Sequence, residues 1–371
     1  MIEELKRHIK IVLKIVLMNT LYLFLAVYGF FKRKPSLIPR RELKIGILFL
    51  SSLGFGDLIM LSPVIQAIAD IFSDSQIYLV NRFKEIICFK GLKWVGDEEG
   101  KRMKFDLVIS PTLNLHHIPF IFKSKYWLGY FAKPRMQSNF SKILGSYNPR
   151  KGHFLLKGFE LLKALNIDKS IELEEKIKVK NVIYPKLCLK ESTISRNLKG
   201  IPYLAFAPFS AHKERQWPFS YFAEVIKFII NKNLVQKIVL LGGNSNWEEK
   251  QKEKLMKYLK DMPILDLVGK ISLQENFFII KNSSIFMGLD SGPSHAAYCL
   301  GNKTIVIFVS VDPLDRIPLS KTTTKIFYFI PKNCPGFPLY SGLWRPNYKK
   351  CQKWALTIKA KEVIKKLSSI V

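Results

Sequence analysis

The stretch that decides the fold lies in the second half of the chain, and it is Ser284-Ile285-Phe286-Met287-Gly288-Leu289-Asp290-Ser291-Gly292-Pro293-Ser294-His295-Ala296-Ala297-Tyr298-Cys299-Leu300. Its apolar first part is typical of a buried parallel strand, and the residues after Pro293 have the pattern of a helix. The start of such a helix offers free backbone N–H groups and the positive end of the helix dipole, so it suits a phosphate group. Asp290 is then suited to fixing loop amides or a sugar hydroxyl, and His295 to facing the ligand. A structural interpretation is equally open, in which Asp290 and Ser291 only cap the helix and His295 is a histidine of the core.

Strands and helices alternate on both sides of this stretch. The expected strands lie at 42–50, 76–80, 106–110, 126–130, 203–207, 237–241 and 264–268, and the main expected helices at 58–68, 152–165, 221–231, 246–260, 273–281 and 359–370. This alternation predicts an α/β protein with two doubly wound parallel sheets. We expect a Rossmann-like domain at 42–185, a polar, lysine-rich connection, a second Rossmann-like domain at 200–335, and a tail at 336–371. Both halves would present their loops to one interdomain cleft.

A glycine-containing turn follows the first expected strand, with the sequence Ser51-Ser52-Leu53-Gly54-Phe55-Gly56-Asp57. Its two glycines allow a ligand to approach the backbone closely. Asp57 would point from the helix start into the crevice, either as a catalytic base or as an N-cap. His116 and His117 follow another strand and are candidates for the same crevice, although a surface loop is the favoured alternative.

Composition restricts the classes of partner. The chain has 371 residues, which suggests about two domains, and its 48% hydrophobic and 13% aromatic content excludes a disordered protein. The formal net charge of +30 implies an anionic partner, unless it only reflects a lysine-rich background. Because no nucleic-acid-binding module or aromatic-basic repeat is present, we expect an anionic membrane surface or phosphorylated substrates rather than nucleic acid.

The cysteines and histidines indicate neither disulfides nor a metal site. The five cysteines are scattered without a C-x-x-C pair, and the six histidines show no H-E-x-x-H spacing. A reduced, cytosolic compartment and no metal are therefore expected.

Residues 1–41 form a separate segment, in which an uncharged apolar run at 15–31 has basic residues on both sides. The run is short for a bilayer span, and the double basic flank gives no orientation. We expect a membrane-associating helix, either lying in the interface or spanning once.

Several motifs in order resemble glycosyltransferase family 9, the lipopolysaccharide heptosyltransferases and their relatives. They are Ser51-Ser52-Leu53-Gly54-x-Gly56-Asp57, x-Arg215-Gln216-Trp217-Pro218, Leu240-Leu241-Gly242-Gly243, Gly269-Lys270-x-Ser272-Leu273 and Asp290-Ser291-Gly292-Pro293-x-His295. The resemblance covers about residues 43–370. It implies a GT-B fold of two Rossmann-like domains, with the terminal helix returning to the N-terminal domain. It also implies inverting, metal-independent transfer of a sugar from a nucleotide-activated heptose.

The same resemblance assigns roles to residues. Asp57 matches the proposed general base. Arg215 matches a position usually held by lysine that contacts the donor phosphates. The candidate donor and phosphate set is Arg215, Gly242, Gly243, Asp290, Ser291, Gly292 and His295, with Lys213 added because it lies near Arg215 in the sequence. The candidate nucleoside set is Glu248, Gly269, Lys270 and Leu273. The candidate acceptor and cleft set is Ser52, Gly54 and Gly56, with His116 added because it follows a strand.

Two departures from the family pattern leave alternatives open. Asn244-Ser245-Asn246-Trp247 stands where heptosyltransferases often present an acidic residue to the ribose, so the nucleotide is open. The glycine turn, which includes Phe55 between its two glycines, is one residue longer than the Leu-Gly-Asp form common in the family.

The expected function is heptose transfer from ADP-heptose to a lipid-linked oligosaccharide such as lipopolysaccharide core, at the cytoplasmic face of the bacterial inner membrane. The alternative is a non-catalytic, membrane-associated paralogue that binds a glycan or nucleotide.

Overall fold

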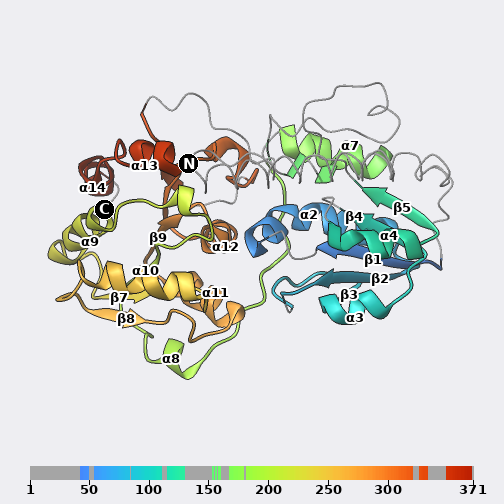
Figure 1. Ribbon diagram of the computed structural model, residues 1–371, viewed down its shortest axis with the longest axis horizontal. Helices are drawn as coiled ribbons and strands as arrows, with labels where there is room; N and C mark the ends of the chain where they lie inside the picture. The colour runs from blue at the N-terminus through green and yellow to red at the C-terminus, as the bar shows by residue number, and fades with distance from the viewer. Residues whose placement is uncertain are drawn as a thin grey trace, which may run out of the picture.

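The computed structural model describes residues 42–49, 54–83, 85–110, 115–129, 153, 155–156, 158–159, 167–178, 181–320, 326–332 and 348–369. They form two α/β lobes, and helices α2 (Phe55–Ile71) and α12 (Gly292–Leu300) meet at the junction between them (Figure 1). Within these ranges, no helix combines the length and the apolar composition needed to cross a bilayer. The membrane-associating helix expected in residues 1–41 lies outside them.

The N-terminal lobe is built on a five-stranded parallel sheet with the order β3-β2-β1-β4-β5. Its strands are β1 (Lys44–Phe49), β2 (Gln76–Asn81), β3 (Leu92–Val95), β4 (Leu107–Ser110) and β5 (Tyr126–Gly129). Ile45, Ile47 and Leu48 of the central strand β1 have no exposed surface. Continuous burial of this kind is typical of a parallel sheet that is covered on both faces.

The C-terminal lobe is built on a six-stranded parallel sheet with the order β11-β10-β9-β6-β7-β8. Its strands are β6 (Tyr203–Ala207), β7 (Lys237–Leu240), β8 (Ile264–Asp266), β9 (Ile285–Leu289), β10 (Thr304–Ile307) and β11 (Ile326–Phe329). Counted within the lobe, this is the 3-2-1-4-5-6 order of doubly wound dinucleotide-binding folds. The expected pair of doubly wound, Rossmann-like sheets is confirmed.

Helix α2 begins earlier than expected, at Phe55, and carries Pro63 in its interior. A proline at this position cannot donate a backbone hydrogen bond to the carbonyl of Ile59. The hydroxyl of Ser62 donates to that carbonyl instead, at 2.7 Å. The helix therefore continues through the proline, and Asp57 lies in its first turn.

Other elements were not anticipated from the sequence. The strands β3, β10 and β11, each four residues long, were not expected, although the equally short strands β4, β5 and β7 were. The connection that looked polar and lysine-rich contains two helices, α7 (Ile167–Lys178) and α8 (Thr193–Arg196). Short helices α3 (Asp97–Arg102) and α4 (Ile118–Lys123) follow β3 and β4, and helices α10 (Asn246–Met256) and α11 (Leu273–Asn282) complete the C-terminal lobe.

The two C-terminal helices are α13 (Tyr348–Ala355) and α14 (Ala360–Ser368), and they pack on the C-terminal lobe (Figure 1). Val363 and Leu367 of α14 share one buried core with Phe222 and Ile226 of helix α9 (Phe219–Asn231). The expectation that the terminal helix returns to the N-terminal domain is therefore not met. The physical reason is that the apolar face of α14 is already covered by α9.

Candidate functional site

The candidate site lies where the chain order reverses in both sheets. Helix α2 follows β1, which lies next to β4 in the first sheet, and helix α12 follows β9, which lies next to β6 in the second. In open α/β sheets, ligands bind at such switch points, outside the carboxyl ends of the strands. The two helices bring these switch points against each other, because α2 and α12 are in contact.

Two glycines allow this close approach. A Cβ atom added to Gly56 would lie 2.6 Å from Cδ2 of His295 and 3.0 Å from the Cα of Gly292. A Cβ atom added to Gly292 would collide with the ring of Phe55. The ring of Phe55 also lies 5.9 Å from that of Phe277 in α11. The glycines of the two motifs therefore serve the contact between the lobes.

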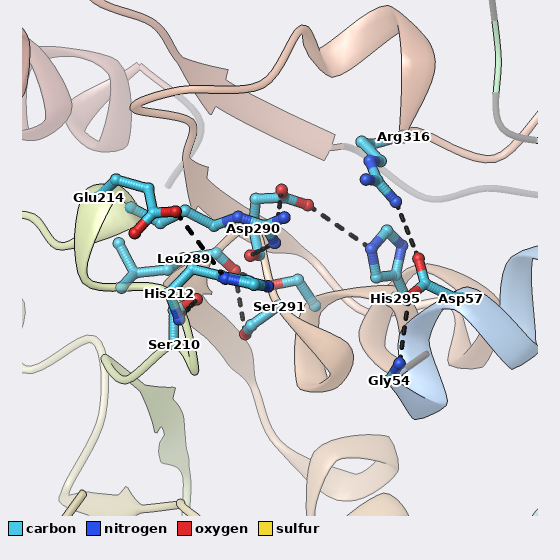
Figure 2. A network of polar contacts seen from close by, with 12 residues as sticks. Gly54, Asp57, Ser210, His212, Glu214, Leu289, Asp290, Ser291, His295 and Arg316 are labelled. Atoms are coloured by element: carbon cyan, nitrogen blue, oxygen red, sulfur yellow. Dashed lines mark hydrogen bonds and ion pairs between the residues drawn. The ribbon is translucent and has the colours of Figure 1, made fainter. Parts of the chain in front are cut away.

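Asp57 is held at the start of α2 by both of its carboxylate oxygens. Oδ2 accepts a hydrogen bond from the backbone N–H of Gly54 at 3.1 Å. Oδ1 accepts one from Nη1 of Arg316 at 3.0 Å, although Arg316 belongs to the other lobe (Figure 2). Asp57 is thus an N3 residue of the helix rather than its N-cap, and its side chain is 23% exposed.

Asp290, Arg215 and His295 form the buried centre of the C-terminal lobe's part of the site. Nη1 of Arg215 lies 3.0 Å from Oδ2 of Asp290 and also donates to the Asp290 backbone carbonyl at 2.8 Å. Nε2 of His295 lies 3.5 Å from Oδ1 of Asp290 (Figure 2). Burial by itself raises the pKa of the Asp290 carboxyl, but Arg215 and His295 outweigh burial and hold that pKa well below its usual range. Asp290 is therefore ionised, and it fixes the Arg215 guanidinium.

Sequence reasoning missed two residues of this site, Arg316 and His153. Arg316 follows the 3₁₀ turn η4 (Pro313–Asp315), and its side chain is only 10% exposed. Burial disfavours its charge, but the carboxylates of Asp290 and Asp57 raise its pKa above the usual value. His153 binds the carbonyl of Ile317 through Nε2 at 2.7 Å. Neither residue belongs to a recognisable spacing pattern, so no sequence signal identifies them.

The start of α12 is not capped by the side chain at its N-cap position. Ser291 occupies that position in an extended conformation, and its hydroxyl donates to the carbonyl of Leu289 at 3.3 Å rather than accepting from the helix. The ordinary N-cap role considered for Ser291 is thus not observed. The positive end of the α12 dipole is directed at the junction of the lobes.

The remaining donor-side candidates lie at the carboxyl ends of neighbouring strands in the C-terminal lobe. Gly242 and Gly269 join two loops, because the Gly269 N–H donates to the Gly242 carbonyl at 3.1 Å and Gly269 has a φ of +69°. The carboxylate of Glu248 folds back toward Gly243 and accepts from the Ser245 hydroxyl at 2.9 Å. The Glu248 carboxylate thus occupies the space that a side chain at position 243 would take, because a Cβ atom added to Gly243 would lie 2.7 Å from Oε2 of Glu248.

Other candidate residues have different surroundings. Lys213, on the 3₁₀ turn η3 (Lys213–Arg215), is exposed and lines a pocket of about 150 Å³ with Gln216, Trp247, Gln251 and Lys254. Lys270 pairs with Asp266 at 3.0 Å, and Leu273 packs against the core.

One acceptor-side candidate, His116, is not among the residues labelled in the network of Figure 2. His116 lies exposed on the 3₁₀ turn η2 (Leu115–His117), and Ser52 lies outside the described residues. In the part of the chain that the structure describes, no group of three or more His, Cys, Asp or Glu side chains is arranged to hold a metal ion.

Comparison with known protein families agrees with the motifs. The model of glycosyltransferase family 9 (heptosyltransferase) matches residues 103–335, which is more than half of the chain. Lipopolysaccharide heptosyltransferase 1 of Campylobacter coli is 30% identical over 99 residues, which are 27% of this chain and 29% of that protein. The aligned segment thus spans less than a third of that relative's length.

Solved structures extend the likeness to nearly the whole chain. The glycosyl transferase family 9 protein of Veillonella parvula has a TM-score of 0.64 at 15% identity, over 90% of this chain and 97% of that one. The E. coli ADP-heptose lps heptosyltransferase II has a TM-score of 0.61 at 13% identity, over 88% and 98%. At these identities the likeness concerns the fold, and it confirms the expected GT-B type of architecture.

Proposed function

Because this chain belongs to glycosyltransferase family 9, we propose that it is an inverting, metal-independent enzyme that moves a heptose from a nucleotide diphosphate to a lipid-anchored glycan. The observation that carries the proposal is the position of Asp57. This carboxylate, on the N-terminal lobe, lies across the junction from the start of α12 and the Arg215–Asp290 pair.

In the proposed reaction, Asp57 accepts the proton of an acceptor hydroxyl as that oxygen attacks the anomeric carbon. The bond between this carbon and the diphosphate oxygen breaks on the opposite face, so the configuration inverts. Negative charge develops on the departing diphosphate. The dipole of α12 and the fixed guanidinium of Arg215 stabilise that charge, with Lys213 as a further cation nearby.

We propose ADP-heptose as the donor. The support is the name of the E. coli structure, which is an ADP-heptose enzyme of the same fold. In this chain Glu248 is the acidic residue next to the loop after β7, and its carboxylate is a hydrogen-bond acceptor suited to ribose hydroxyls. Glu248 would thus replace the acidic residue that the family pattern has earlier in this loop.

We propose lipopolysaccharide core as the acceptor and the cytoplasmic face of the inner membrane as the place of reaction. The support is the C. coli relative, named a lipopolysaccharide heptosyltransferase, together with the net charge of +30 and the basic, apolar segment at 1–41. Positive charge attracts both anionic lipids and a phosphorylated acceptor. Residues 1–41 would keep the enzyme beside its lipid-linked substrate.

The test is transfer from ADP-heptose to a lipid-linked acceptor, followed by mass spectrometry, with Asp57→Asn compared with the unmodified chain. We expect kcat to fall roughly 10²–10⁴-fold, because a general base contributes about that much. Binding of ADP, measured by thermal shift, should stay within about threefold. Asp70→Asn is the matched control, because Asp70 is exposed near the end of the same helix. Full activity of Asp57→Asn would exclude Asp57 as the base.

A non-catalytic paralogue is the second candidate, and one observation favours it. Both carboxylate oxygens of Asp57 already accept hydrogen bonds, as those of a structural residue would. Binding of ADP-heptose without any turnover by the unmodified chain would support this candidate.

A further inference from the structure

Arg316 is a buried cation that joins the two lobes at the proposed base. It comes from the turn after η4 in the C-terminal lobe, and its Nη1 donates to Oδ1 of Asp57 at 3.0 Å (Figure 2). The same atom lies 3.9 Å from Sδ of Met60, one turn further along α2. A buried charge is costly unless it is paired and hydrogen-bonded. Because the guanidinium is buried, its pairing with the Asp57 carboxylate is needed to offset the cost of burying the charge.

The backbone beside Arg316 is anchored to segments outside its own turn. His153 binds the carbonyl of Ile317 at 2.7 Å, and the N–H of Val182 binds the carbonyl of Leu319 at 2.8 Å. Both partners precede the C-terminal sheet in sequence. The Arg316 side chain consequently has one defined position relative to α2 when the lobes are in contact.

The pairing leaves Asp57 able to accept a proton. Each carboxylate oxygen has about two acceptor sites, and the Gly54 N–H and the Arg316 guanidinium occupy one on each oxygen. Within the described residues, no other hydrogen bond to these oxygens is present, and we take the remaining sites as those that an acceptor hydroxyl would use. Because a guanidinium keeps its charge at any working pH, it holds the carboxylate in one orientation without competing for the proton.

We propose that Arg316 is a positioning residue for the base, supplied by one lobe to the carboxylate of the other, so that Asp57 is aligned only when the lobes are closed. This inference rests on the proposed function, and it adds a residue that lies outside the five motifs quoted above. Gly56 and Gly292 allow the contact, since a Cβ atom at either position would lie less than 3 Å from a side chain of the other lobe. When the lobes separate, Arg316 leaves Asp57, and only the Gly54 N–H still orients the carboxylate.

The experiment uses the full chain with the single variants Arg316→Met, Arg316→Lys and Asp57→Asn, the double variant Asp57→Asn/Arg316→Met, and the control variant Arg196→Met. In Arg316→Met, kcat should fall by about 100-fold, because a misplaced catalytic group costs about that much. The KM for the donor should stay within about threefold of the value for the unmodified chain. Arg316→Lys should have a kcat at least about tenfold higher than that of Arg316→Met, since lysine restores the positive charge.

The double variant separates positioning from a general structural role. If Arg316 acts through Asp57, the double variant should be no slower than Asp57→Asn alone, within about threefold. Losses that multiply would overturn the proposal, because they would mean that Arg316 acts independently of Asp57. Arg196→Met is the matched control and should leave kcat unchanged, because Arg196 pairs with Glu191 at 4.0 Å on an exposed part of the surface.

The remaining outcomes are also decisive. Full kcat in Arg316→Met, or a raised donor KM with unchanged kcat, overturns the positioning role while the proposed function stands. Full activity of Asp57→Asn removes the base role of Asp57 and this inference with it, while the proposed transfer stands. No transfer by the unmodified chain removes the proposed function itself. If Arg316→Met does not fold, the kcat of the double variant Asp57→Asn/Arg316→Lys is compared with that of Asp57→Asn in the same way.

Discussion

Burial decides the charge of His153, a single residue beside the proposed site. Its side chain accepts from the N–H of Leu155 at Nδ1, at 3.1 Å, and binds the carbonyl of Ile317 through Nε2. These two bonds require the neutral tautomer with the proton on Nε2. Burial is the main cause that lowers the His153 pKa to about 4. Protonation of His153 would take place at Nδ1 and would therefore break the hydrogen bond from Leu155, whereas the Nε2–H would still donate to Ile317.

This lowered pKa predicts a pH-dependent loss of stability. The unfolded histidine has a pKa of about 6.5, so the unfolded state binds more protons than the folded state between pH 6.5 and 4. The stability contribution of His153 is present above pH 6.5 and is lost as the pH falls toward 4. His153→Gln should remove about 2 kcal/mol of the drop in unfolding free energy between pH 7.5 and 5. Denaturant unfolding at both pH values measures this drop, and a drop that is the same in His153→Gln and in the unmodified chain would contradict the prediction.

The buried pair of Arg215 and Asp290 gives a second prediction for single residues. Asp290→Asn should destabilise the fold by about 3–5 kcal/mol, because it leaves a buried guanidinium without its counter-ion. Asp266→Asn is the control, since Asp266 is 24% exposed in its pairs with Lys252 and Lys270, and it should cost about 1 kcal/mol. Equal losses in urea unfolding would show that the Arg215–Asp290 pair is no more important than a partly exposed one.

Trp217 connects secondary-structure elements that are far apart in sequence. It precedes α9, has no exposed surface, and donates its indole N–H to the carbonyl of Ile358, between α13 and α14, at 3.0 Å. Its ring meets that of Phe222 edge-on at 4.7 Å. The tryptophan of the motif that contains Arg215 therefore holds the C-terminal helices on α9.

Trp217→Phe should cost about 2–4 kcal/mol of unfolding free energy, because it leaves a cavity and removes the partner of a buried carbonyl. Guanidinium unfolding measures the loss. The same change at Trp127 should cost about 1 kcal/mol, because that indole is only partly buried and its bond to Ser110 is 3.4 Å long. A loss at Trp217 no greater than at Trp127 would contradict the connecting role.

Closure of the two lobes is a property of the whole molecule, and Gly56 is where it can be tested. An added methyl group would lie 2.6 Å from the His295 ring and 3.0 Å from the Gly292 backbone, so the lobes would have to move apart. Gly56→Ala should increase the radius of gyration measured by small-angle X-ray scattering. It should also lower kcat by about 10–100-fold through misplacement of the reacting groups. Gly96→Ala should change neither quantity, because a Cβ atom there meets no atom within 4 Å. An unchanged radius for Gly56→Ala would show that the contact can relax locally.

The sequence by itself determined the class of fold and the turns that carry the proposed chemistry. Alternation of apolar strands with helical patterns is a local property, so it predicted two doubly wound sheets and placed Asp57 and Asp290 after strands. The family motifs, later supported by the family match, depend only on residue order. The helix α7 escaped prediction because its local pattern is too polar.

Only the tertiary structure decided which side chains meet. Arg316 and Asp57 are 259 positions apart, and their contact depends on how the two lobes pack against each other. The same holds for His153 and Ile317, and for α14 on α9. Packing of this kind follows from the shapes of complete surfaces, such as the bare backbone at Gly56 and Gly292, and no local pattern of residues encodes it.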